Sequence, residues 1–276
     1  MNRLPFLRPL LVTAMLFTGV AQAAPDARQV LAASPVDDIV AQYPAMMSQG
    51  IRDGLSRSGQ VPPMVANTIG SVVSNSFSAA DIEQQIVTDM QDQLTDDQLE
   101  AVQDWYETPL ARKISAAEIA ASAPSAWQDI QARAPALNKE YQGSRKAEMY
   151  DRFDRAARAT ESAVDTTIAV QLGLATAMAA FGSDPVNYDE LRQEIESQRT
   201  RLRGIVGQQV YDSYLYTYED IGAQEMDLYL GFLESPAGAA FSRVVTNSIQ
   251  QAITDPVESV GRQMSRFLSP QSPAGQ

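Results

Sequence analysis

A chain of 276 residues without histidine or cysteine cannot build the sites that most often carry hydrolytic or redox chemistry. The missing residue types exclude Ser-His-Asp and Cys-His catalytic groups and ordinary zinc, copper and haem sites. Calcium needs only oxygen ligands and stays open, but no calcium loop pattern occurs, and we expect neither a metal nor a cofactor. The chain is also acidic, with a net charge of −13, which disfavours binding to nucleic acid because phosphate contacts depend on Lys and Arg.

The first 23 residues have the three parts of a cleavable secretory signal peptide. Arg3 and Arg8 make the start basic, an apolar run follows over 10–20, and the Ala-Gln-Ala of 21–23 has the pattern of a cleavage site. The apolar run is shorter than the roughly 20 residues that span a membrane. We therefore expect export to the periplasm with cleavage after Ala23, where a chain without cysteine folds without disulfides. The loss of two arginines would change the net charge from −13 to −15.

Helix-start signals recur along the remaining chain, whereas long alternating strand patterns are missing. Ser78, Thr95, Asn187 and Thr217 each suit the N-cap of a helix, and Gln98 completes a capping box with Thr95. We therefore predict an all-α protein of roughly ten to twelve helices.

One pentad occurs twice, as WYETP at 105–109 and as FLESP at 232–236. A Thr or Ser before Pro suits an N-cap followed by the first helical position, and the proline ends the helix that precedes it. Each pentad therefore predicts two helices that meet at an elbow, with the aromatic residue packed into the angle. The residues with these structural roles are Trp105, Thr108 and Pro109 in the first copy and Phe232, Ser235 and Pro236 in the second.

The glutamate of each pentad has two interpretations. Glu107 and Glu234 lie near the start of the helix that follows the elbow, where the helix dipole favours a carboxylate. Paired carboxylates are also the catalytic groups of glycoside hydrolases. The sequence leaves both roles open.

The first pentad and its surroundings resemble the bacterial exported family called domain of unknown function 2059. The resemblance is carried by Thr95-Asp96-Asp97-Gln98-Leu99 and by Trp105-Tyr106-Glu107-Thr108-Pro109-Leu110-Ala111. Ala111 stands where the family usually has Gly, whereas the second copy keeps Gly238 and lacks the tyrosine. The resemblance implies an all-helical secreted domain and no assigned activity.

From the repeated pentad we infer two pseudo-repeated helical halves, over 24–145 and 146–268. The last residues, 269–276, are rich in Pro, Ser, Gly and Gln and are predicted to be a disordered tail.

Arg152, Arg155 and Arg158 occur at a spacing of three and line one side of a predicted helix. Acidic neighbours such as Asp151 and Asp154 make a solvated, salt-bridged face one interpretation. A binding site for an anionic ligand or for an acidic partner surface is the other.

Residues 166–183 contain no charged side chain. Their number is just sufficient for a membrane-spanning helix. The abundance of Ala, Thr and Gly, together with Gln171, favours a buried central helix instead, and we expect no stable membrane span after signal cleavage.

Tyr211, Tyr214 and Tyr218 fall at positions i, i+3 and i+7 and share one helical face. Because tyrosine combines apolar area with a hydroxyl, such a face suits the binding of a peptide or a glycan. The alternative is that the three side chains pack between helices.

These features favour a secreted, periplasmic, non-catalytic binding or interaction protein of the cell envelope, whose partner is an envelope protein or a small ligand. A carboxylate-based hydrolase of envelope glycans and a carrier of a small apolar ligand are the alternatives. A Ser-Lys hydrolase is disfavoured because Lys113, Lys139 and Lys146 are all predicted to be solvated. A non-enzymatic role is thus favoured, although the sequence identifies no ligand.

Overall fold

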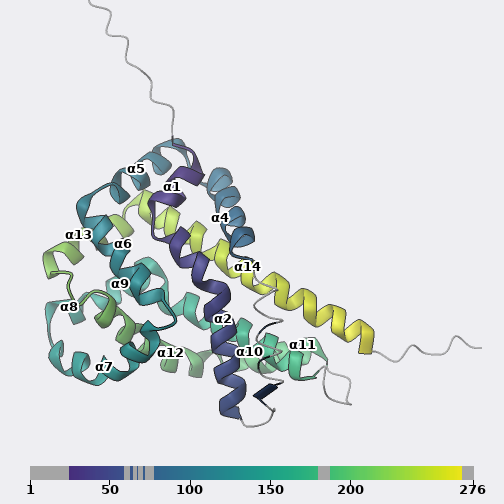
Figure 1. Ribbon diagram of the computed structural model, residues 1–276. Helices are drawn as coiled ribbons and strands as arrows, with labels where there is room; N and C mark the ends of the chain where they lie inside the picture. The colour runs from purple at the N-terminus through teal and green to yellow at the C-terminus, as the bar shows by residue number, and fades with distance from the viewer. Residues whose placement is uncertain are drawn as a thin grey trace, which may run out of the picture.

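The computed structural model describes residues 25–58, 63, 64, 67, 71, 78–179 and 187–268. In these residues every regular element is an α-helix, which confirms the all-α prediction for this part of the chain (Figure 1). The predicted signal peptide, the predicted tail over 269–276 and the end of the uncharged stretch lie outside the described residues.

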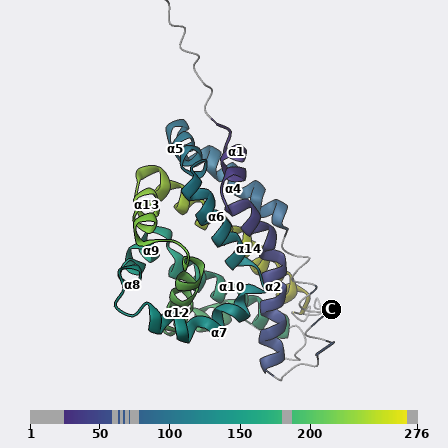
Figure 2. The ribbon, with the colours of Figure 1, turned by 60° about the vertical axis from the view of Figure 1, so that its left-hand side comes forward.

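The helices of the first part of the chain are α1 (Ala27–Ala33), α2 (Val36–Ser58), α4 (Ala79–Gln93), α5 (Asp96–Tyr106), α6 (Pro109–Ser122) and α7 (Ala126–Glu140). The later helices are α8 (Arg145–Glu148), α9 (Tyr150–Ala157), α10 (Ala159–Ala179), α11 (Tyr188–Ser197), α12 (Arg199–Thr217), α13 (Ala223–Leu233) and α14 (Pro236–Leu268). In both ribbon views α1, α4 and α5 gather at one end of the molecule, and α7, α10 and α12 at the other (Figures 1 and 2).

Local capping decides where several helices begin. Ser78, Thr95 and Asn187 cap α4, α5 and α11 through their side-chain oxygens, as the sequence predicts. Thr217 does not cap a helix, because it is the last residue of α12. Gly222 takes the N-cap position of α13, and its N–H donates to Glu225 Oε2 at 2.7 Å. The prediction for Thr217 is therefore wrong, because the chain makes a further turn before α13 starts.

Both pentads form the predicted elbow between two helices. α5 and α13 are each 11 residues long, and α6 and α14 each begin at the proline of the pentad. Thr108 Oγ1 accepts the N–H of Ala111 at 3.1 Å, and Ser235 Oγ accepts the N–H of Gly238 at 3.0 Å. The hydroxyl thus satisfies an N–H that has no partner within the new helix.

The aromatic residues of the two elbows pack against each other. Trp105 and Phe232, the first residues of the two pentads, stack with ring centroids 4.7 Å apart and planes 7° apart. Tyr106 meets Phe232 and Phe241 edge-on, at centroid distances of 5.7 and 5.8 Å. The two elbows, which lie far apart in the sequence, are therefore in direct contact.

The principal hydrophobic core extends through both parts of the chain. It includes Leu31 and Met90 from the N-terminal part and Leu215 and Leu230 from the C-terminal part, all nearly inaccessible to solvent. α4 packs along α14, and α12 packs along α7 and α6. The core crosses the predicted boundary at residue 145, and the pseudo-repeat itself stays a prediction.

α10 carries most of the uncharged stretch and packs against α12, α14 and α11. Val164, Ile168 and Leu172 on α10 form a second buried cluster with Ile195 of α11 and with residues of α12. Within the described part of the chain, none of the helices has both the length and the apolar character needed to cross a membrane. The described part of α10 is therefore a helix packed within the protein.

The second elbow has room only for glycine at position 238. A Cβ atom there would lie 2.0 Å from the carbonyl oxygen of Phe232. Replacing Gly238 with Ala should therefore lower the free energy of unfolding by about 2–3 kcal/mol, since overpacking forces the backbone to move. The measurement is urea unfolding monitored by circular dichroism.

The matched control is Gly204→Ala on α12, where an added Cβ would meet nothing within 4 Å. This variant should gain about 0.5–1 kcal/mol, because alanine is the better helix former. Equal effects of the two variants would show that the backbone at the second elbow is not close-packed.

Candidate anion-binding site

α9 is a short helix that carries a concentrated positive charge. Arg152 and Arg155 lie on α9, and Arg158 is its C-cap. The C-cap N–H donates to the carbonyl of Asp154, and the N–H of Thr160 donates to the Asp154 carboxylate at 2.7 Å. The chain therefore turns sharply from α9 into α10, and Arg158 lies at the turn.

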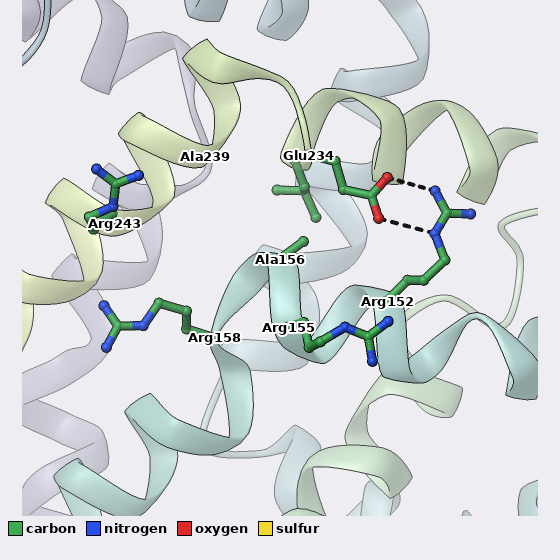
Figure 3. A pocket seen from close by; sticks show the side chains of 8 residues that line it. Arg152, Arg155, Ala156, Arg158, Glu234, Ala239 and Arg243 are labelled. Atoms are coloured by element: carbon green, nitrogen blue, oxygen red, sulfur yellow. Dashed lines mark hydrogen bonds and ion pairs between the residues drawn. The ribbon is translucent and has the colours of Figure 1, made fainter.

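The three arginines line one pocket of about 410 Å³ (Figure 3). Its other walls come from the second elbow, through Leu233 and Glu234, and from α14. α14 adds a fourth arginine, Arg243, which no pattern in the sequence connects to α9. The full set of lining residues is Arg152, Arg155, Ala156, Arg158, Leu233, Glu234, Ala239 and Arg243.

One of the four arginines is matched by acidic groups. Arg152 Nε and Nη2 donate to the two oxygens of Glu234, at 3.0 and 2.7 Å, and Arg152 Nη1 lies 3.4 Å from Asp227 Oδ1. The hydrogen bond from Arg152 lowers the pKa of Glu234 below its ordinary value. This end of the pocket is therefore close to neutral.

The other three arginines form no ion pair and no hydrogen bond with an acidic side chain among the described residues, although the charge of Arg155 also lowers the pKa of Glu234. Arg158 Nη1 donates to the neutral amide oxygen of Asn247 at 3.2 Å. No hydrogen bond or ion pair joins the side chain of Arg155 or Arg243 to another part of the described chain. The pocket lining therefore has four arginines and one glutamate, an excess of positive charge on an otherwise acidic protein that attracts anions.

Arg158 also has an unusual backbone conformation. Its φ of 53° and ψ of 33° place it in the left-handed region, and among the described residues no other non-glycine residue has a positive φ. This conformation costs an L-residue roughly 1–2 kcal/mol, and glycine is the usual residue at such a helix end. At this position arginine is therefore less favourable than glycine for the stability of the helix end.

The predicted tyrosine face lies mostly inside the protein. Tyr214 and Tyr218 are only 2% and 3% exposed, and Tyr211 is half-buried. Tyr214 donates its hydroxyl to the carbonyl of Lys146 at 2.9 Å, and Tyr218 donates to Glu118 at 2.6 Å. Tyr214 and Tyr218 therefore pack between helices, the second of the two interpretations, and offer no exposed surface for a ligand.

Glu118 of α6 is a carboxylate that the sequence does not mark as special. Tyr218 and Tyr229 both donate their hydroxyls to its Oε1, at 2.6 and 2.7 Å. Burial raises the pKa of Glu118, and the two hydrogen bonds offset part of that rise. Glu118 therefore connects α6 to α12 and α13, and its position under these helices could not be read from α6 alone.

The prediction that all three lysines are solvated is wrong for Lys146, which is buried. Its residue is 7% exposed, and Nζ donates to the carbonyls of Tyr218 and Glu219 at 2.7 and 2.8 Å. Burial lowers the pKa of Lys146. The carbonyls at a helix C-terminus lack donors within the helix, and this ammonium group supplies donors at the end of α12.

The two pentad glutamates do not share a site. Both are exposed. Glu107 accepts a hydrogen bond from Gln103 at 3.0 Å, whereas Glu234 is held by Arg152 and lines the pocket that Glu107 does not line. A catalytic pair would need both carboxylates to face one cleft, which this arrangement does not provide.

The fold and the site define an all-helical protein with an arginine-lined pocket. Residues 80–140, which extend from α4 to α7, match the family model described as "Uncharacterized protein conserved in bacteria (DUF2059)". The match confirms the predicted family resemblance of the segment around the first pentad, and it does not extend to the second pentad. No curated protein and no solved structure matches the chain. The pocket residues all lie outside the matched segment.

The left-handed conformation at Arg158 predicts a stabilising substitution. Arg158→Gly should raise the free energy of unfolding by about 1 kcal/mol, because glycine adopts a positive φ without steric cost. For a chain of this size the melting temperature should rise by about 2–4 °C, which calorimetry can measure. A lower melting temperature than that of the unaltered protein would contradict this account.

The raised pKa of Glu118 predicts a pH-dependent effect of its substitution. The folded protein holds this proton more tightly than the unfolded chain, so the contribution to stability is complete in acid and is lost as the pH rises through the folded pKa. Glu118→Gln keeps an acceptor for both tyrosines without the charge. The urea midpoint of this variant should therefore match that of the unaltered protein at about pH 4 and exceed it at about pH 7.

The control is Glu100→Gln, because Glu100 is exposed. This variant should show no comparable rise in the urea midpoint at about pH 7. Equal behaviour of the two variants would refute the effect of burial.

Proposed function

We propose that this protein is a non-catalytic binding protein of the bacterial cell envelope, exported to the periplasm, which holds the anionic group of a small ligand. The observation that carries the proposal is the pocket lined by four arginines, three of which form no ion pair among the described residues. Charged groups that fold next to one another without counter-charges lower stability unless a ligand compensates them. The signal-peptide pattern of 1–23 supports export.

The dimensions of the pocket support a small ligand. A volume of about 410 Å³ lies within the range of roughly 300–1,000 Å³ that is common for small-molecule sites. Ala156, Leu233 and Ala239 add apolar wall between the arginines. A ligand with an anionic head and a short carbon part would therefore contact both kinds of wall.

The two alternatives from the sequence find less support. A glycan hydrolase would need two carboxylates about 5–9.5 Å apart across one cleft, and Glu107 does not line the pocket of Glu234. A carrier of an apolar molecule would need an apolar cavity, whereas five of the eight residues that line this pocket are charged. Recognition of an acidic surface on an envelope protein uses the same arginines and differs only in the size of the partner.

We also propose that the second elbow belongs to a second copy of the unit that contains the first. The equal lengths of α5 and α13 support this proposal, as does the packing of α4 on α14 and of α12 on α6 and α7. A family member with one copy should then dimerise, with α4 of each subunit on its partner. A monomeric one-copy member in which α4 packs on its own α6 would contradict the proposal.

Native mass spectrometry of the protein, purified gently from the periplasm of its own host, tests the proposed function. We expect a discrete added mass from an anionic ligand and a chain mass that corresponds to a first residue of Ala24. Arg243→Gln should lose the added mass. Arg112→Gln, which changes an exposed arginine on α6 away from the pocket, should keep it.

Two results would contradict the proposal. An added mass that survives Arg243→Gln would place the ligand elsewhere. A chain mass that includes residues 1–23, or recovery of the protein only from the cytoplasmic fraction, would refute export.

A further inference from the structure

Arg158 and Arg243, two of the arginines without an ion pair, lie on one side of the pocket, whereas the side chain of Arg155 extends toward Arg152. Figure 3 shows Arg158 at the end of α9 and Arg243 on α14 on the same side, while the Arg152–Glu234 pair occupies the opposite side. Arg155 lies between Arg158 and Arg152. The part of the pocket near α14 therefore carries the positive charge that the acidic groups leave unmatched.

Arg158 is held beside Arg243 despite the like charges of the two side chains. Arg158 Nη1 donates to Asn247 Oδ1 at 3.2 Å, and Asn247 follows Arg243 by one helical turn on α14. This bond uses one of the five N–H groups of the guanidinium. The remaining donors of Arg158 and the donors of Arg243 have no acceptor among the described residues. A bound group with several oxygens would satisfy them.

Charge and oxygen count distinguish the anions that could fill this position. At the other side of the pocket one carboxylate, Glu234, is bound bidentately by one guanidinium, Arg152. A second carboxylate would therefore suit either Arg158 or Arg243, and it would leave the other unmatched. A phosphate monoester carries a charge of about −1.5 to −2 and three acceptor oxygens near pH 7. It matches the two guanidinium groups on this side of the pocket better.

We infer that Arg158 and Arg243 form a clamp for a phosphate group, and that Arg155 adds to the positive charge beside it. This inference rests on the proposed anion-binding function and names the class of its ligand. The apolar wall of Ala156, Leu233 and Ala239 leaves room for the carbon part that bears the phosphate. Phosphate of this kind occurs in soluble phosphomonoesters and in lipid headgroups, and the two sources present the same group to the clamp.

Isothermal titration calorimetry on the mature chain at low ionic strength tests the clamp. The probes are inorganic phosphate and glycerol phosphate, compared with succinate and citrate as carboxylate anions. We expect the phosphates to bind and the carboxylates to bind at least about tenfold more weakly. Arg158→Gly and Arg243→Gln should each weaken phosphate binding by about 10- to 100-fold, while Arg112→Gln should leave it unchanged.

Arg158→Gly is the decisive variant because it should raise stability while it weakens binding. A loss of binding in a protein with a higher melting temperature cannot come from unfolding. Such opposite effects are expected where a residue is kept for function at the expense of stability. Phosphate binding that is undiminished in both pocket variants would overturn the clamp.

Vesicle sedimentation separates the two sources of phosphate. The probes are vesicles of phosphatidylcholine alone and vesicles that also contain phosphatidic acid. Co-sedimentation with the second kind only, lost in Arg243→Gln, would support the clamp and assign it to a lipid headgroup. Binding of glycerol phosphate without co-sedimentation would support the clamp and assign it to a soluble ligand.

The remaining outcomes distinguish this inference from the function on which it rests. Binding of citrate or succinate without binding of either phosphate probe or of phosphatidic acid would overturn the clamp and leave the anion-binding function standing. If no anion of either class binds, the clamp and the proposed function both fail.

Discussion

The stack of Trp105 on Phe232 is the interaction on which the arrangement of the two elbows depends. The two rings lie almost parallel, and each lies in the last turn of a helix that is followed by the next helix at a proline. Because each ring belongs to an elbow, the stack sets the position of α13 and of the start of α14 against α5. Leu233 and Glu234 follow Phe232 directly and form one wall of the pocket. The position of this wall therefore depends on an aromatic contact between distant parts of the chain.

Buried polar groups secure the same region from the other side. Glu118 accepts hydrogen bonds from Tyr218 and Tyr229, and Lys146 donates to the carbonyls of Tyr218 and Glu219, which directly follow α12. These bonds have directional requirements that apolar packing lacks, and a buried charge without a partner would be strongly unfavourable. Together they fix the end of α12 and the orientation of α13. The pocket wall therefore rests on an aromatic stack and on a specific polar network.

The predictable part of the site is the part that one helix carries. Arg152, Arg155 and Arg158 could be grouped from their spacing, and the structure brings them to one pocket. Arg243 and Asn247 could not be added, because nothing in the local pattern shows that α14 passes beside the end of α9. The role of the tyrosine face was ambiguous for a related reason. The spacing of Tyr214 and Tyr218 is the same on a solvent-exposed helical face as on a buried one.

What the sequence determined by itself was local: the caps at Ser78, Thr95 and Asn187, the two elbows, and the helical class of the fold. These features depend on a hydroxyl or an amide that meets backbone N–H groups two or three residues away, and on the fixed φ of proline. Tertiary structure alone decided that Lys146 is buried, that Gly238 has no room for a side chain, and that Arg243 lines the same pocket as Arg158. Each of these depends on which helices come together, and that is set by the sum of many weak packing contacts across the whole chain.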